Sequence, residues 1–118
     1  MILIINMSEV TVATIEKRIA DMEKLVARKA RVQRLMRNRD FRELILEDFC
    51  VREAANYIHE AGNPALPQES RDDALQLALA SGHLLRYLNV IEQMGNQAEA
   101  DIATHEALLD DIRAEEDY

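Results

Sequence analysis

The chain has 118 residues, a formal net charge of −8, one cysteine, three glycines and two prolines. This length suits a single domain, the lone Cys50 excludes an intrachain disulfide, and the net charge argues against a protein whose whole surface binds nucleic acid. Ala, Leu, Glu, Arg and Ile dominate the composition, which favours helix over strand and predicts an all-α fold.

The charges are divided unevenly along the chain. Ten of the fourteen Lys and Arg residues lie in residues 17–42, among only three acidic residues. Residues 92–118 reverse the sign, with nine acidic residues and Arg113 as the one base. This division indicates a contact between opposite charges, either within the chain, between copies of it, or with a polyanion.

Residues 1–7 form an apolar arm ahead of the first predicted helix. Its four consecutive apolar residues are far short of the ~20 that span a bilayer, and no positive n-region or small-residue cleavage site accompanies them. We therefore expect no secretory signal and no membrane association, and Met7 offers an alternative translation start. The Ile-rich arm is strand-like, and it is expected either to be disordered or to dock on a neighbouring chain.

The first helix is predicted over about residues 9–37, with Ser8 as its N-cap. Its apolar residues recur at spacings of four, three and four, which is typical of a coiled coil: Ile15, Ile19, Met22 and Val26. Basic residues fall on the opposite side of the helix. Four of them form the basic surface that we expect to meet a partner: Lys24, Arg28, Arg31 and Arg34.

The second helix is predicted over residues 41–61, opened by a capping box of Asp40 and Glu43 and ended by Gly62. Its apolar positions cover more than one stripe, which predicts a helix packed on two sides at the centre of the core: Phe41, Leu44, Ile45, Phe49, Ala54, Ala55, Tyr57 and Ile58. Residues 63–67, with two prolines, are the one loop that we expect.

The third helix is predicted over residues 70–116, with Ser70 as its N-cap. A heptad pattern runs along it at two sets of positions, with His105 as the polar exception: Leu77, Leu84, Ile91, Ala98 and Ile112, and Ser81, Leu88, Gly95, Ile102 and Leu109. Gly82 and Gly95 are weak points, because each glycine costs about 1 kcal/mol relative to alanine inside a helix.

Gly95 leaves two arrangements open. A helix running straight through it gives three long helices, up, down and up, in an elongated bundle or coiled coil. The first and third helices are then parallel, and the acidic segment extends beyond the basic one. A reversal at Gly95 would instead lay the acidic segment antiparallel to the first helix in a four-helix bundle. We favour the long helix, straight or bent, because a two-residue reversal is tight for helices.

No motif in the chain carries chemistry. The three histidines, His59, His83 and His105, are more than twenty residues apart and lack metal-ligand spacing, and no phosphate-binding or nucleophile motif is present. We expect His105 to be partly buried and hydrogen-bonded, Cys50 to be a buried inert thiol, and the acidic C-terminal residues to be solvated. We therefore do not expect the chain to be an enzyme, and we expect no catalytic residue, metal or cofactor.

The junction Asn38-Arg39-Asp40-Phe41, within the stretch from Leu35 to Glu47, is followed by Arg52-Glu53-Ala54-Ala55. This pattern resembles small helical proteins of tailed bacteriophages, which share a basic leading helix, a short Pro-containing loop and an acidic last helix. The likeness covers roughly residues 9–116, and Cys50-Val51 departs from it, where an aromatic residue or Lys is expected. The resemblance implies a virion or assembly role, in the virion or host cytoplasm, and transfers no catalytic residue.

The sequence thus predicts a non-catalytic interaction protein that self-associates as a homo-oligomer or docks on a larger assembly. We expect the heptad seam to extend past the compact part of the chain and to lack an intrachain partner, so its apolar residues are the expected contact: Leu84, Leu88, Ile91, Ile102, Leu109 and Ile112. Two alternatives stay open: a nucleic-acid-associated protein that binds through the basic first helix, and a small phage regulator that captures a host protein.

Overall fold

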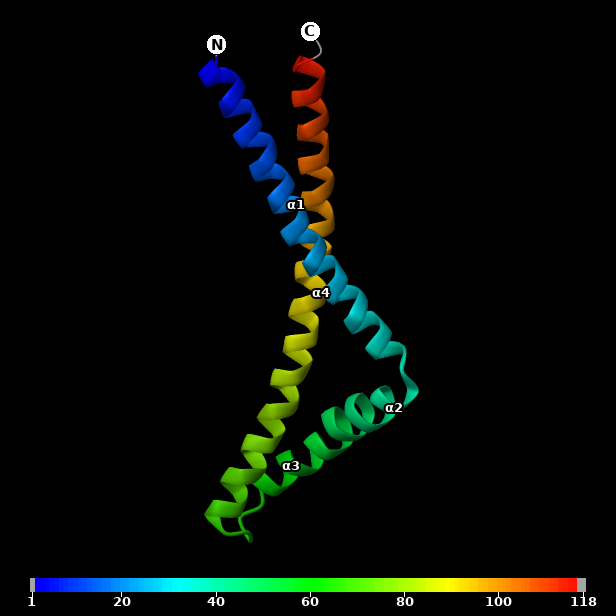
Figure 1. The fold of residues 1–118 in the computed structure, drawn as a ribbon. Coiled ribbons are helices and arrows are strands. Elements are labelled where there is room, and N and C mark those ends of the chain that lie inside the picture. The colour runs from blue at the N-terminus through cyan, green and yellow to red at the C-terminus, as the bar shows by residue number, and fades with distance from the viewer. Residues whose placement is uncertain (1, 117–118) are drawn as a thin grey trace. The chain divides into compact units, whose positions relative to one another are not determined.

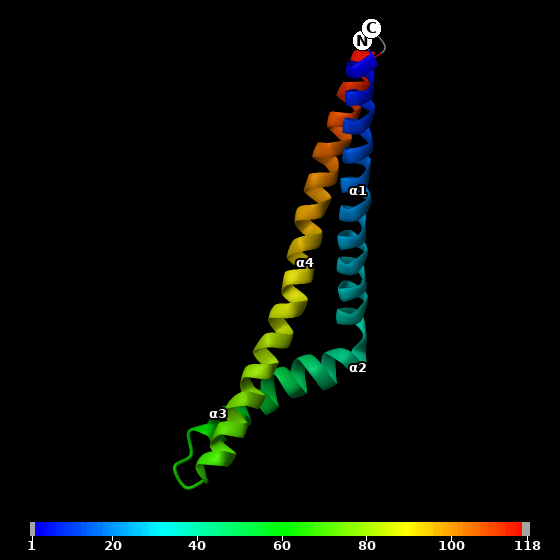
Figure 2. The same ribbon diagram turned by 60° about the vertical axis from the view of Figure 1, so that its left-hand side comes forward.

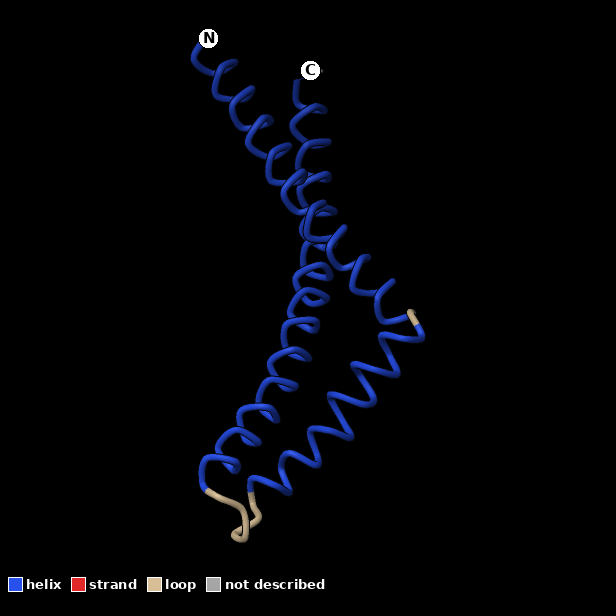
Figure 3. Tube along the Cα trace, turned by 60° about the horizontal axis from the view of Figure 1, so that its bottom comes forward, coloured by secondary structure: helices blue, strands red, loops and turns tan. Residues whose placement is uncertain are grey.

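The computed structural model describes residues 2–116, in three helical segments (Figure 1). The first is α1 (Ile2–Arg37) and the third is α4 (Gln68–Glu116). Between them, α2 (Arg39–Phe41), η1 (Arg42–Glu53) and α3 (Ala54–Ala61) follow one another without a break. Within the described residues the non-helical positions are Asn38 and residues 62–67, and none is a strand (Figure 3). The all-α prediction is confirmed.

Helix α1 begins earlier than the sequence indicated. It includes the backbone of residues 2–7, so the expected start near Ser8 and the strand-like interpretation of the arm are both wrong. The physical reason is that residues 1–7 contain no glycine or proline, so no helix-breaking residue separates them from the rest of α1. The predicted docking of the arm concerns side chains that lie outside the described part of the structure.

The junction between α1 and α2 is made by Asn38. Its backbone is extended (φ −69°, ψ 123°), and its Oδ1 accepts a hydrogen bond from the Phe41 N–H at 2.9 Å. Asn38 is therefore the N-cap, and the predicted capping box at Asp40 is wrong. Glu43 instead accepts a hydrogen bond from Arg39 Nε at 2.9 Å.

The middle of the second segment, η1, is a π-helix of 12 residues. Six apolar residues in it and at its two ends recur every four or five positions and are buried or half-buried: Phe41, Ile45, Leu46, Phe49, Cys50 and Ala54. In an α-helix, Phe41 and Cys50 would lie about two and a half turns apart, on opposite sides. The wider π winding, with bonds from each N–H to the carbonyl five residues before it, brings such residues onto one face.

The prediction that this segment packs on two sides is therefore wrong. Leu44 is 62 % exposed and Ile58 is 55 % exposed. At the end of the segment Gly62 is the C-cap as predicted, since its N–H donates to the Ile58 carbonyl at 3.1 Å. Arg71 Nε then donates to the Ala61 carbonyl at 3.1 Å, which ties the start of α4 to the end of α3.

The described residues divide into two compact units. The central unit is Arg31–Val90, and the terminal unit consists of the residues up to Ala30 and from Ile91 on. The central unit contains the end of α1, the second helical segment and the start of α4. The terminal unit contains only parts of α1 and α4.

In the terminal unit the two helices are antiparallel. Ile15 and Ile19 of α1 pack with Leu109 of α4, and partly buried apolar side chains surround them: Val12, Ile102 and Ile112. Glu16 pairs with Arg113 and Lys29 pairs with Glu99, so rising numbers in α1 match falling numbers in α4. Figure 2 shows the start of α1 beside the end of α4.

The prediction of one long helix through Gly95 is confirmed, since α4 runs without interruption from Gln68 to Glu116. Its corollary, that the first and third helices are parallel, is wrong. That corollary required the chain to reverse between the first and second helices, whereas at Asn38 it turns through an open angle (Figure 1). The basic and acidic segments consequently meet within one chain, without a reversal at Gly95.

The heptad pattern of α4 correctly marks its core side. Its members are buried or half-buried from Ser81 to Ile112, and Leu77 is the exception at 43 % exposed. Gly95 lies where α4 and α1 approach closely, because a Cβ added to it would be 2.4 Å from the Cβ of Lys29. Close approach of two helices therefore explains this glycine.

Candidate protein-interaction surface

Exposed apolar side chains are concentrated in the central unit. Of the twelve large apolar side chains that are exposed among the described residues, all but Met94 and Leu108 belong to it. They are Leu35, Leu44, Val51, Ile58, Leu75, Leu77, Leu79, Leu85, Tyr87 and Val90. Single exposed apolar residues are normal on a protein surface, so their grouping on helix faces is what matters.

The buried part of the same unit is small. Its buried residues are Val32, Cys50, Ala74, Ser81 and Leu88. No side chain in the described structure is less than 2 % exposed. The central unit thus leaves more large apolar side chains exposed than it buries.

One group of exposed residues lies on the outer face of α4, which we define by Asp72, Leu75, Leu79, Gly82 and Arg86. At about 100° per residue these five positions fall within one narrow sector. Leu88, which is buried, is nine residues after Leu79 and so points to the opposite side of the helix. Helix α4 is therefore apolar on two sides within the central unit.

A second group lies on the second helical segment. Leu44 and Val51 of η1 are 62 % and 63 % exposed, the highest values among the large apolar side chains described. Ile58 of α3 follows Val51 by seven residues and is 55 % exposed. Seven residues bring two side chains to one side of an α-helix but not of a π-helix, so these three residues are candidate contacts individually and do not form one face.

The seam residues that the sequence selected for contact with another chain lie instead toward the inside of this one. Leu88, Ile91 and Leu109 are only 6–7 % exposed. Leu84 is half-buried, while Ile102 and Ile112 are half-buried against the cluster of Ile15, Ile19 and Leu109. The premise that the seam lacks an intrachain partner is wrong, since α1 supplies one.

The four residues of the predicted basic surface are all exposed. Lys24 lies 3.7 Å from Asp21, one turn earlier in the same helix. Lys29, which was not among them, is the basic residue that the fold uses: its side chain is 14 % exposed and its Nζ is 3.0 Å from Glu99 Oε1. The signal for this role was present, because Lys29 follows Val26 by three residues and so continues the apolar spacing of α1.

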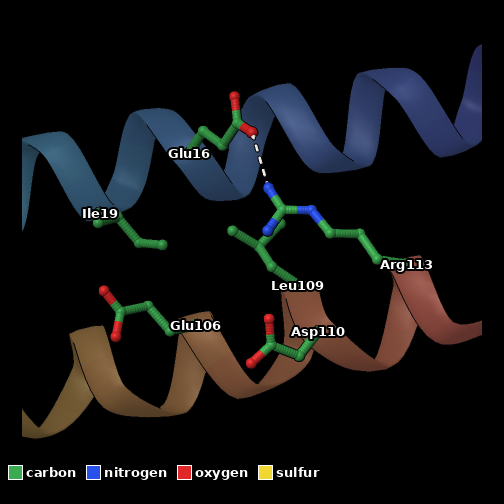
Figure 4. Close-up of a pocket in the computed structure, with 6 residues that line it drawn as sticks. All are labelled: Glu16, Ile19, Glu106, Leu109, Asp110 and Arg113. Atoms are coloured by element: carbon green, nitrogen blue, oxygen red, sulfur yellow. Dashed lines mark ion pairs between the residues drawn. The ribbon is translucent and has the colours of Figure 1, made fainter.

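An open groove of about 420 Å³ lies between the two helices of the terminal unit. Figure 4 shows Ile19 and Leu109 in it, with Arg113 reaching across to Glu16 at 3.6 Å. Glu106 and Asp110 complete its lining. Among the described residues no group of three His, Cys, Asp or Glu side chains could hold a metal ion.

His105 is half-buried, and its Nδ1 is 2.7 Å from the Asp101 carbonyl one turn earlier. The expectation of a partly buried, hydrogen-bonded histidine is confirmed. His59 and His83 are exposed.

Cys50 is buried as expected, and burial raises the pKa of its thiol. At neutral pH a smaller fraction of Cys50 is therefore in the reactive thiolate form than in an exposed cysteine. An alkylating reagent also reaches a buried thiol less easily. We expect iodoacetamide to alkylate Cys50 in the folded chain at least about tenfold more slowly than in the urea-unfolded chain. Equal rates, followed by mass spectrometry at one pH, would contradict a buried inert thiol.

Comparison of this chain with protein-family models, curated proteins and solved structures found no match. The resemblance to tailed-phage proteins therefore rests on the sequence pattern around Asn38 alone and stays a prediction. Within the described residues, none of the helices combines the length and the apolar character needed to cross a membrane.

Proposed function

We propose that this chain is a non-catalytic helical interaction protein that associates with further copies of itself through the exposed apolar side chains of its central unit. The observation that supports this most strongly is the apolar character of α4 on two sides. A helix with apolar residues on two sides can pack on both, and within the described part of the central unit Leu75 and Leu79 on the outer face of α4 are 42 % and 48 % exposed. Grouped exposed apolar residues mark protein contacts more often than isolated ones.

The charge division gives this proposal a specific salt dependence. Lys29–Glu99 and Glu16–Arg113 are formed within one terminal unit, so opposite charges already meet without a second chain. Association through apolar side chains is not weakened by salt in the way that surface ion pairs are. We therefore expect the oligomer to persist at high salt.

Light scattering at low and high salt tests the proposal. The expected molar mass is a multiple of the 13.5 kDa of one chain at both salt concentrations. The double variant Leu44→Ser/Leu79→Ser, which removes an apolar contact from each candidate group, is expected to have a lower mass. Leu108→Ser is the matched control, since Leu108 is 45 % exposed but belongs to the terminal unit.

Two results would contradict self-association. One is a wild-type chain that is a monomer at both salt concentrations. The other is an oligomer that dissociates at high salt and is insensitive to the double variant, because that behaviour indicates pairing of basic and acidic segments between chains. Circular dichroism of each variant shows whether the helices are intact.

We further propose that the chain belongs to a larger assembly, as the resemblance to tailed-phage proteins implies. Self-association would build a component of a tailed-phage particle or of its assembly intermediates. Quantitative mass spectrometry of purified particles and of assembly intermediates, from a phage that encodes the chain, tests this. Absence of the chain from both the particles and the intermediates would contradict the virion and assembly role, but it would not contradict self-association.

Nucleic-acid binding is the second candidate, supported by the exposure of Lys24, Arg31 and Arg34 on α1. Fluorescence anisotropy with labelled DNA and RNA tests it at the two salt concentrations. Salt-sensitive binding that is lost in Arg31→Glu/Arg34→Glu, with helicity unchanged, would favour this candidate. We expect no such binding, because the net charge of the chain is −8.

A further inference from the structure

The outer face of α4 carries charges in a self-complementary order. Asp72 and Arg86 are each seven residues from Leu79, on either side of it, and all three are on one face of a continuous helix. All three side chains are exposed. Asp72 accepts a hydrogen bond from Gln68 Nε2 at 2.8 Å, and Arg86 forms no ion pair within the described part of the chain.

Gly82 on the same face is not explained by any contact with the described residues of the chain. A Cβ added to Gly82 would meet nothing within 4 Å, whereas one added to Gly95 would collide with Lys29. A glycine inside a helix costs about 1 kcal/mol relative to alanine. A helix from outside the chain would make use of the missing side chain, since it could approach α4 closely there.

We propose that the partner of this face is a second copy of the same chain, packed antiparallel across a two-fold axis near Leu79. This inference rests on the proposed self-association and specifies its geometry. Leu79 contacts Leu79 of the second copy, and Leu75 lies over the space that Gly82 leaves in the other helix. Asp72 of each copy then lies opposite Arg86 of the other.

The charge order selects this arrangement over its alternatives. In a parallel pair, Asp72 would face Asp72 and Arg86 would face Arg86, and like charges at such close range oppose association. A two-fold antiparallel pair forms the same Asp72–Arg86 contact twice, as expected of an interface in which both copies use one patch. Self-complementarity of this kind favours a second copy over an unrelated protein.

Charge exchange tests the geometry directly. Asp72→Arg and Arg86→Asp are each expected to raise the dimer dissociation constant at least about tenfold, because each places like charges opposite one another twice. The double variant Asp72→Arg/Arg86→Asp restores both pairs and is expected to dimerise again. An equimolar mixture of the two single variants is expected to form heterodimers, in which both opposite-charge pairs are present.

The measurement is sedimentation velocity at several protein concentrations, with one single variant carrying a fluorescent label so that heterodimers can be distinguished. Asp73→Arg is the matched control. It makes the same change of charge in the same turn of α4, but Asp73 lies about 100° away from the outer face. It is expected to dimerise like the wild type.

The outcomes separate this inference from the proposal on which it rests. If the wild type is a dimer and both single variants keep its dissociation constant, the antiparallel geometry is wrong while self-association stands. The same holds if the two single variants dissociate but do not recombine when mixed. A wild-type monomer overturns both. Recombination in the mixture together with rescue in the double variant supports the two-fold pair, since a merely unfolded variant would restore neither.

Discussion

Replacing Leu109 with alanine is expected to lower the free energy of unfolding by about 2–5 kcal/mol. Leu109 is 6 % exposed and packs with Ile15 and Ile19, which are 4 % and 8 % exposed. This cluster is the apolar contact that holds the two helices of the terminal unit together, and it is small, so little surrounding structure can close the cavity. Urea unfolding followed by circular dichroism, at one fixed protein concentration, measures the change.

Leu108→Ala provides the control for this prediction. Leu108 is next to Leu109 in the same helix but is 45 % exposed and lies outside the cluster. Its replacement is expected to change the free energy of unfolding by less than about 1 kcal/mol. Equal losses for the two variants would mean that Leu109 does not pack against α1 as the structure describes.

Gly95→Ala is expected to destabilise the chain by about 1–3 kcal/mol, although helix propensity alone predicts a gain of about 1 kcal/mol. The new Cβ would be 2.4 Å from the Cβ of Lys29 and 2.7 Å from its Cδ. Because the nearest atom belongs to the base of the Lys29 side chain, rotation of that side chain does not remove the clash. The helices have to separate, which also strains the 3.0 Å contact between Lys29 and Glu99.

Asn96→Ala is the matched substitution for this experiment. Asn96 is exposed and adjacent to Gly95 in the same helix, so its replacement changes helix propensity without a steric conflict. It is expected to leave stability unchanged or raise it by up to about 0.7 kcal/mol. If Gly95→Ala behaved in the same way and stabilised the chain, the close approach of α1 and α4 would be wrong.

The sequence indicated correctly where the helices end and which side of α4 is covered. The predicted C-terminal ends at Arg37 and Ala61 are those of the structure. These features depend on local chemistry: the heptad positions of α4, the loop prolines, and Gly62 as a C-cap. Helix starts were predicted less accurately where two nearby side chains could each serve as the N-cap. At the start of the second segment the N-cap is Asn38 and not Asp40.

The second helical segment shows why an apolar pattern can mislead. Its apolar residues cover too wide a sector for one side of an α-helix, which indicated packing on two sides. The structure brings part of this set, with Leu46 and Cys50, onto one face by winding as a π-helix, and it leaves Leu44 exposed. The number of residues per turn decides which residues share one face of a helix. Because an α-helix was assumed, the prediction of which residues are buried was wrong.

The predicted contact residues differ from the candidate contact residues in the structure for another reason. The sequence marked Leu88, Ile91 and Leu109 as a seam, and they are one, but it could not say whether the partner was α1 or another chain. With those residues buried or half-buried in the chain itself, the exposed apolar residues are others of the central unit, among them Leu79 on the outer face of α4.

The sequence by itself determined that the chain is helical, that α4 is continuous, and that opposite charges are placed to meet. Only the tertiary structure decided that they meet in an antiparallel pair within one chain, through Lys29–Glu99 and Glu16–Arg113. The physical reason is that helix formation and capping depend on residues a few positions apart. The direction in which α1 meets α4, by contrast, depends on the turn at Asn38 and on contacts between residues about seventy or more positions apart.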